Sequence, residues 1–147
     1  MRPARTVGAG LVVDASVAMK WLVNENGSEA ALRLRDRDLI APALLRIETA
    51  NVLRTLVARQ VATPDKALDL FALLQDAPVT IVDHDEALER RALQLGLELS
   101  HPVYDCFYLA LAERMGRRLI TADTRFFKVL SSTPYAVLAI ALEADRL

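Results

Sequence analysis

The feature that most restricts the fold of this chain is the regular alternation of short apolar runs with longer helical patterns. Such an alternation is typical of βαβ units, in which each helix crosses over between two parallel strands. We therefore predict an α/β fold with a central, mostly parallel β-sheet and α-helices on both faces. The apolar runs are 11–13, 39–41, 79–82 and 119–122, and the helical patterns are 15–23, 28–36, 42–59, 64–76, 85–96 and 102–116.

Several residues indicate where these helices begin and end. Thr63, Pro64 and Asp65 supply an N-cap hydroxyl, a proline at the first helical position and an acid in the first turn, which together predict a helix start. A short helix is expected after residue 122, and the pattern of the last apolar run, 135–140, is ambiguous. The other signals predict helix starts at Ser28, Pro42 and Pro102 and helix ends at Gly96 and Gly116.

The length and composition of the chain fit one domain spanning residues 1–147. Hydrophobic residues make up 53% of the chain, yet no apolar stretch approaches the roughly 18 residues that a membrane-spanning helix needs. A formal charge of −1 excludes a strongly basic nucleic-acid-binding domain but allows a local basic face. We expect a cytoplasmic protein without a membrane segment, with residues 1–10 forming a flexible extension ahead of the first strand.

Two aspartates follow apolar runs directly. Asp14 comes after the run that begins at Leu11, and Asp123 comes after the run that begins at Leu119. The carboxyl ends of parallel strands form the crevice in which α/β proteins bind ligands, so both side chains are candidates for a site. Each aspartate also fits a structural role, as the N-cap of the helix that follows it.

Two further acids are predicted to face the sheet. Glu48 falls in the apolar stripe of its helix, with Leu44 and Val52 one turn before and after it. Asp105 lies in the first turn of the helix opened by Pro102, where the helix dipole stabilises an anion. A structural ion pair for Glu48 and an exposed surface acid for Asp105 are the plain alternatives.

The four carboxylates together indicate a metal site. If they meet in one crevice, they repel each other unless a multivalent cation offsets their charge. Oxygen ligands without a His or Cys partner favour Mg²⁺ or Mn²⁺ over zinc. Such a site suits metal-assisted hydrolysis of a phosphodiester.

Four segments of the chain resemble the PIN-domain ribonucleases, and specifically the VapC-type toxins of bacterial type II toxin–antitoxin (VapBC) systems. The order of the segments is that of the family, and they extend over most of the chain. They are VVDASV at 12–17, ETANVL at 48–53, YDCFYLALA at 104–112 and LITAD at 119–123.

The resemblance implies an endoribonuclease whose acids bind one or two divalent ions, Mg²⁺ with Mn²⁺ also active, and whose products carry a 3′-hydroxyl and a 5′-phosphate. It implies that Ser16 and Thr121 orient bound water or neighbouring carboxylates, although either hydroxyl could instead cap a turn. Its implied partners are an RNA substrate, a cognate VapB-type antitoxin and a second copy in a homodimer. The implied catalytic and metal-binding acids are Asp14, Glu48, Asp105 and Asp123.

Five other residues have a predicted role. Arg125, two residues after Asp123, is the candidate contact for an RNA phosphate. His84 and His101 are expected to cap helix starts, with substrate contact as the alternative for His101. Trp21 and Cys106 are expected to pack, and a single cysteine excludes both an intramolecular disulfide and a cysteine zinc cage.

Two other functions fit parts of this pattern. A response-regulator receiver also has an acidic Mg²⁺ pocket, and the run at 79–82 is followed by Asp83 and Asp85. That fold needs a lysine at a late strand end, and Lys128, inside the helix expected after Asp123, fits that place poorly. The second alternative is a PIN-fold binding module without catalytic activity.

Overall fold

The five strands form one parallel sheet in the order β3-β2-β1-β4-β5. The structure, a computed structural model, describes residues 10–142. Strand order reverses around β1, because the chain moves outward from β1 to β3 and then returns to place β4 on the other side of β1. The strands are β1 (Gly10–Val13), β2 (Asp38–Pro42), β3 (Thr80–Val82), β4 (Arg118–Thr121) and β5 (Ala139–Ala141).

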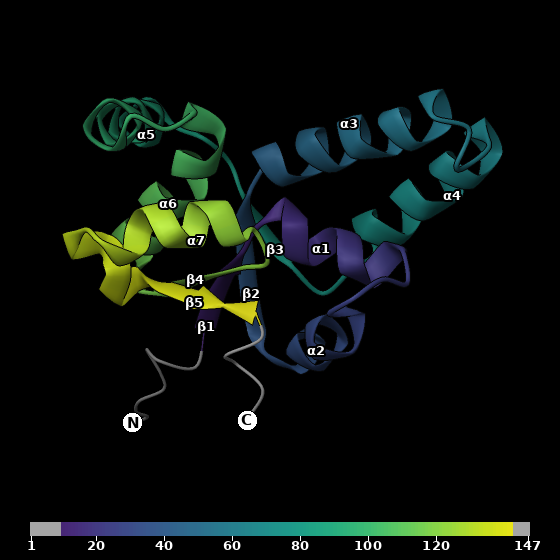
Figure 1. Ribbon diagram of the computed structural model, residues 1–147, viewed down its shortest axis with the longest axis horizontal. Coiled ribbons are helices and arrows are strands. Elements are labelled where there is room, and N and C mark those ends of the chain that lie inside the picture. Colours follow the sequence, from purple (N-terminus) through teal and green to yellow (C-terminus); the bar gives the residue numbers. More distant parts are fainter. Residues whose placement is uncertain (1–9, 143–147) are drawn as a thin grey trace.

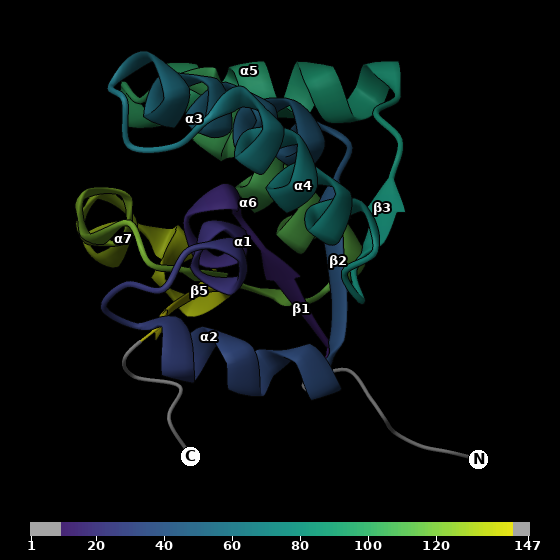
Figure 2. The same cartoon turned by 90° about the vertical axis from the view of Figure 1, so that its right-hand side faces the viewer.

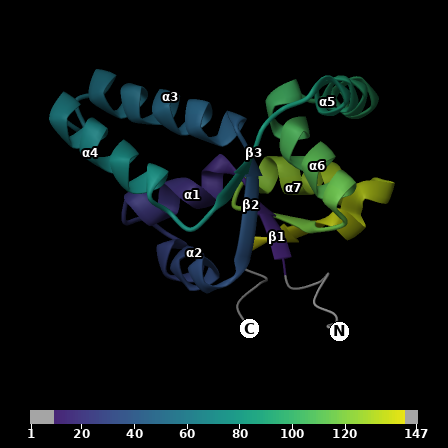
Figure 3. The same ribbon diagram turned by 180° about the vertical axis from the view of Figure 1, so that it is seen from behind.

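Helices cover both faces of this sheet, as predicted from the alternation of runs. Figures 1 and 3 show α1 to α4 on one side of the sheet and α5 to α7 on the other. The right-handed crossovers of parallel strands explain this division, because the direction of travel along the sheet reverses after β3. The helices are α1 (Ala15–Leu22), α2 (Ser28–Arg33), α3 (Leu44–Ala58), α4 (Pro64–Gln75), α5 (Glu86–Leu99), α6 (Val103–Met115) and α7 (Thr124–Ser131), with 3₁₀ turns at Leu34–Asp36 and Pro134–Leu138.

The two central strands form the middle of the core. Val12 and Val13 of β1 and Leu119 and Ile120 of β4 have no exposed surface. Strands buried on both faces read as continuous apolar runs, which is the pattern of these segments. Since β1 and β4 are neighbours, the residues that follow them lie close together at the carboxyl edge of the sheet.

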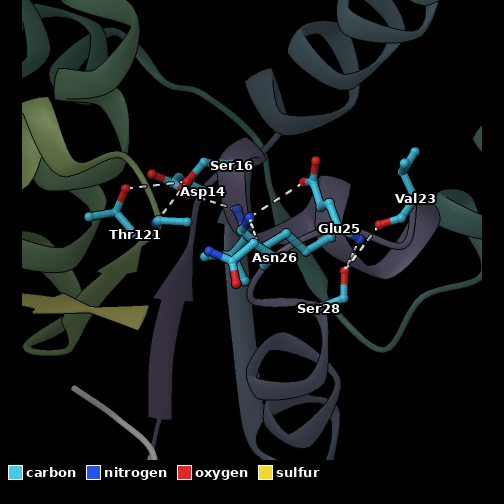
Figure 4. A network of polar contacts seen from close by, with 10 residues as sticks. Asp14, Ser16, Val23, Glu25, Asn26, Ser28 and Thr121 are labelled. Atoms are coloured by element: carbon cyan, nitrogen blue, oxygen red, sulfur yellow. Dashed lines mark hydrogen bonds and ion pairs between the residues drawn. The ribbon is translucent and has the colours of Figure 1, made fainter. Parts of the chain in front are cut away.

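The predicted start of α3 at Pro42 is wrong by two residues, and the predicted capping role of Ser28 is wrong although α2 does begin there. Pro42 is the last residue of β2, paired with Val82, and α3 begins at Leu44. The first turn of α3 is instead capped by His84, as predicted for that histidine, because its Nε2 accepts a 3.1 Å hydrogen bond from the Leu44 N–H. Ser28 is the first residue of α2 rather than its cap. Its hydroxyl donates to Val23 O and accepts from the Glu25 N–H, which closes the preceding turn (Figure 4).

The predicted end of α5 at Gly96 is also wrong, because the helix continues to Leu99. Gly96 serves close packing, since a Cβ added there would lie 3.1 Å from both His101 O and Val103 Cγ2. The helix ends where Ser100 adopts a left-handed conformation with φ 51°. The absent side chain of Gly96 thus lets the turn that leads into α6 pass close to α5.

Gly96→Ala is expected to destabilise the protein by about 1 kcal/mol. Alanine favours an isolated helix by roughly 0.5–1 kcal/mol, but overpacking against the backbone oxygen of His101 costs about 1–3 kcal/mol. Chemical denaturation measures the difference. Leu97→Ala, at a neighbouring position that is 72% exposed, is the control and should change stability by less than about 0.5 kcal/mol. A Gly96→Ala protein as stable as the wild type would contradict this packing role.

The first and last described segments of the chain are both strands of the sheet. The ambiguous run at 135–140 divides into a 3₁₀ turn and the first residues of β5. A flexible extension is predicted for residues 1–10. Residues 1–9 lie outside the described residues, and Gly10 belongs to β1. Between residues 10 and 142, no helix has the length and apolar character needed to cross a membrane.

Candidate metal centre

Asp14 lies at the carboxyl end of β1 and is 5% exposed. Its Oδ1 accepts hydrogen bonds from Ser16 Oγ at 2.6 Å and from the Val17 N–H at 3.2 Å. Asp14 is therefore the N-cap of α1. Capping the helix does not prevent Asp14 from also binding a ligand, because both hydrogen bonds end on Oδ1.

Ser16 and Thr121 connect this aspartate to β4. The Ser16 hydroxyl accepts a 2.9 Å hydrogen bond from the Ala122 N–H and lies 3.4 Å from Thr121 Oγ1 (Figure 4). Thr121 Oγ1 in turn accepts from the Asp123 N–H at 3.0 Å. These hydroxyls connect the first turn of α1, which follows β1, with the end of β4, and each also bonds to one of the two aspartates.

Asp123 repeats the arrangement of Asp14 at the end of β4. Its Oδ1 accepts from the backbone N–H groups of Arg125 at 3.0 Å and Phe126 at 3.2 Å, so Asp123 caps α7. Here too a single carboxylate oxygen takes the helix-capping bonds. The structural role offered as the alternative, capping of the following helix, is therefore present in both aspartates.

The two acids on helices are each held by a ring side chain. Tyr108 donates its hydroxyl to Glu48 Oε1 over 2.6 Å, and the His101 Nε2 lies 2.7 Å from Asp105 Oδ2. The imidazole of His101 also stacks on Phe126, with ring centroids 4.7 Å apart. His101 therefore contacts a candidate site residue, rather than a helix-start N–H as predicted.

All four carboxylates line one cavity. Its volume is about 640 Å³, and apolar side chains such as Ile47 and Tyr104, both exposed, form part of its wall. Within residues 10–142, no hydrogen bond reaches the second oxygen of Glu48, Asp105 or Asp123. The lining residues are Asp14, Ala15, Ser16, Met19, Leu44, Ile47, Glu48, Asn51, Val52, Tyr104, Asp105 and Asp123.

The electrostatics of the cavity follow from burial and from charge repulsion. Burial is the main cause that raises the pKa of Asp14 from 3.8 to about 6, and the charge of Asp105 adds to it against the hydrogen bonds that lower it. Burial likewise raises the pKa of Glu48, and Asp105 contributes there too. Burial and the neighbouring carboxylates raise the pKa of Tyr108, so its phenol stays protonated and donates to Glu48. These anions favour a cation between them.

The donor set fits a hydrated Mg²⁺ or Mn²⁺ better than a fully protein-coordinated ion. Among residues 10–142, no three His, Cys, Asp or Glu side chains are arranged to hold a metal ion together. Mg²⁺ keeps several waters and needs only one or two carboxylates from the protein. A wide cavity lined by four acids meets that requirement, since Glu48, Asp105 and Asp123 each have one oxygen without a hydrogen bond from the described residues.

The other predicted residues lie outside the cavity wall. Arg125 is exposed on α7, and only its backbone N–H contacts Asp123. Cys106 is buried, as predicted, and burial raises the pKa of its thiol to about 11. Trp21 is partly buried against the core and donates its indole N–H to Ala31 O at 2.7 Å.

The receiver interpretation finds no support in the geometry. Asp85 is exposed, caps α5 and forms a bidentate ion pair with Arg114, which lowers the pKa of Asp85 to about 2. Lys128 lies in α7 and is exposed. No lysine is among the described residues that line the cavity.

Two site features were missed in the sequence. Asn51 lines the cavity because it lies three residues after Glu48, on the same face of α3. Tyr108 lies three residues after Asp105 on α6, a spacing that would have revealed a second polar group facing the site. The helix periodicity places both residues on the same face as an acid of the site. Using it requires knowing which side of each helix faces the sheet.

Comparison with known proteins agrees with this architecture. Ribonuclease VapC12 of Mycobacterium tuberculosis (strain ATCC 25618 / H37Rv) is 34% identical over 116 residues, covering 78% of this chain and 88% of that protein. PAE2754 from Pyrobaculum aerophilum, a crystal structure, matches with a TM-score of 0.67 at 21% identity, over 92% of this chain and 85% of that one. A chain of a toxin–antitoxin complex from Klebsiella pneumoniae matches with a TM-score of 0.65 at 15% identity, over 90% and 97% of the two chains.

The family profile described as PIN domain matches residues 11–130. This range begins in β1 and ends in α7, so it contains all four carboxylates of the cavity. The resemblance seen in four separate segments of the sequence is confirmed. The chain belongs to the PIN domain family and is similar to proteins named ribonuclease VapC.

Proposed function

We propose that this protein is a Mg²⁺- or Mn²⁺-dependent endoribonuclease of the VapC type. The observation that carries the proposal is the single cavity lined by Asp14, Glu48, Asp105 and Asp123, each held through one oxygen. The similarity to ribonuclease VapC12 supports RNA as the substrate. A PIN-fold module that only binds would have no need of four buried or half-buried acids around one cavity.

The residues of the chain would act mainly by positioning. Hydrolysis forms a bond from a water oxygen to phosphorus and breaks the bond from phosphorus to the 3′ oxygen, which leaves a 3′-hydroxyl and a 5′-phosphate. Asp14, Glu48, Asp105 and Asp123 would hold the cation through carboxylate oxygens that face the cavity. When bound, Mg²⁺ or Mn²⁺ lowers the pKa of a water and stabilises charge on the phosphate. Ser16 keeps Asp14 in place through its 2.6 Å hydrogen bond.

Cleavage of total cellular RNA by the purified protein tests this function. We expect discrete fragments with 5′-phosphate ends in Mg²⁺ or Mn²⁺ and none in EDTA. Without a metal ion the carboxylates supply no Lewis acid to activate the water and polarise the phosphate. Sequencing of the fragment ends identifies the target. A folded protein that leaves RNA intact in both ions would favour the binding module, and fragments that persist in EDTA would contradict metal dependence.

The substrate and protein partners are also part of the proposal. Arg125 would contact an RNA phosphate, since it is exposed two residues after Asp123. Without the four acids the remaining formal charge is positive, which suits a basic rim. The toxin–antitoxin complex from Klebsiella pneumoniae supports a cognate VapB-type antitoxin as partner, and the exposed apolar side chains of Ile47 and Tyr104 at the cavity provide a surface for it. We further propose a cytoplasmic location and a homodimer.

A further inference from the structure

The hydrogen bond between Tyr108 and Glu48 has features that packing alone does not explain. Tyr108 is 1% exposed, and its hydroxyl donates to Glu48 Oε1 over 2.6 Å. Hydrogen bonds to an ionised carboxylate are shorter and stronger than those between neutral groups. Phenylalanine would fill the same volume, so the hydroxyl has its effect through the carboxylate.

This bond also fixes the position of one helix relative to another. Glu48 lies on α3 and Tyr108 on α6, 60 residues apart in the sequence. Within residues 10–142 it is the only hydrogen bond or ion pair that joins these two helices. α3 packs chiefly against α4, and Figure 2 shows this pair in front of α6. The bond therefore determines how Glu48 is placed relative to Asp105, which is on the same helix as Tyr108.

The hydrogen bond from Tyr108 determines which oxygen of Glu48 is available in the cavity. Because Oε1 accepts the phenol, the carboxylate cannot rotate freely, and Oε2 alone is free of hydrogen bonds from the described residues. A ligand oxygen held in one orientation binds a cation without first losing rotational freedom. Residues that orient metal ligands typically change metal affinity or activity by about 10–100-fold when mutated.

We propose that Tyr108 is a positioning residue that holds Glu48 so that Oε2 is available to the divalent cation in the cavity. This inference rests on the proposed metal-dependent function. Tyr108 acts through Glu48 and does not itself touch the substrate. Its effect on metal binding therefore depends on the presence of the Glu48 carboxylate, which distinguishes positioning from general support of the core.

Calorimetric titration of the full chain with Mn²⁺ tests the proposal. Tyr108→Phe is expected to raise the Mn²⁺ dissociation constant by about 10-fold or more. Tyr135→Phe is the matched control, because the Tyr135 hydroxyl donates to Glu98 Oε1 at 2.8 Å, outside the cavity. Tyr135→Phe should leave Mn²⁺ affinity within about twofold of the wild type, since neither Tyr135 nor Glu98 lines the cavity.

A double-mutant cycle with Glu48→Gln shows whether the two residues act together. In the Glu48→Gln protein, adding Tyr108→Phe should change Mn²⁺ affinity by less than about twofold, because the carboxylate that Tyr108 orients is gone. If Tyr108→Phe merely loosened the fold, the same loss would persist in the Glu48→Gln background, and the proposal would be overturned. Wild-type affinity in Tyr108→Phe would also overturn it. Absence of Mn²⁺ binding by the wild type would instead refute the proposed function and this inference with it.

Discussion

Asp14→Asn is expected to reduce RNA cleavage by about 10³-fold while the protein remains folded. Metal stabilisation of the reacting phosphate is worth several kcal/mol, and about 1.4 kcal/mol corresponds to tenfold in rate. The variant keeps an Oδ1 that can accept from Ser16 and from the Val17 N–H, so the cap of α1 is retained. Initial cleavage rates over a series of Mn²⁺ concentrations measure the loss.

The matched control for this variant is Asp85→Asn. Asp85 is also an aspartate that caps a helix, but it lies outside the cavity and pairs with Arg114. The same change of a carboxylate to an amide there should leave the cleavage rate within about twofold of the wild type. Equal loss in both variants, or activity retained in Asp14→Asn, would remove Asp14 from the metal centre.

The metal-free protein is expected to become more stable as the pH falls from about 7.5 to about 4.5. The pKa of Asp14 is about 6 in the folded chain and 3.8 ordinarily, so the folded state binds its proton more tightly. Stability is therefore greatest where Asp14 is protonated and is lost as the pH rises through this window. The gain over this range is about 2 kcal/mol, or a rise of about 4–8 °C in Tm.

Thermal unfolding in EDTA at several pH values measures this effect, with Asp14→Asn as the control. The variant lacks the titrating group, so it should keep only the smaller contribution of Glu48, whose pKa is also raised. Below about pH 4 the direction reverses, because the pKa of Asp85 is lowered to about 2 and the stability that Asp85 contributes is lost on protonation. A slope in Asp14→Asn equal to that of the wild type would show that other groups cause the pH dependence.

The central part of the fold could be predicted from local patterns. The run that became β1 is apolar throughout, and the run that became β4 is mainly apolar. Asp14 follows β1 directly, and Asp123 lies two residues after β4. The position of Asp14 and Asp123 at one edge then follows from strand adjacency alone. Thr63 and Pro64 likewise started α4 as predicted, because both capping signals act within one turn.

The errors have a different physical origin, since each depends on a contact with a residue outside the helix or strand concerned. Gly96 signals a helix end by its local conformational freedom, but in the structure it accommodates the backbone of His101. Pro42 fits a helix start, yet pairing with Val82 extends β2 through it. The bond from Tyr108 to Glu48 spans 60 residues and depends on how two helices approach each other, which periodicity within either helix does not report.

The bond from the Ala122 N–H to Ser16 Oγ joins residues 106 positions apart, and this separation bears on the synthesis of the chain. Ribosomes add roughly 5–20 residues per second, so on the order of ten seconds separates the emergence of these two partners. During that time the nascent chain has Asp14 but lacks both β4 and Asp123. The centre is thus completed only after β4 and Asp123 have been synthesised, and a nascent chain that has not reached them carries an incomplete set of acids.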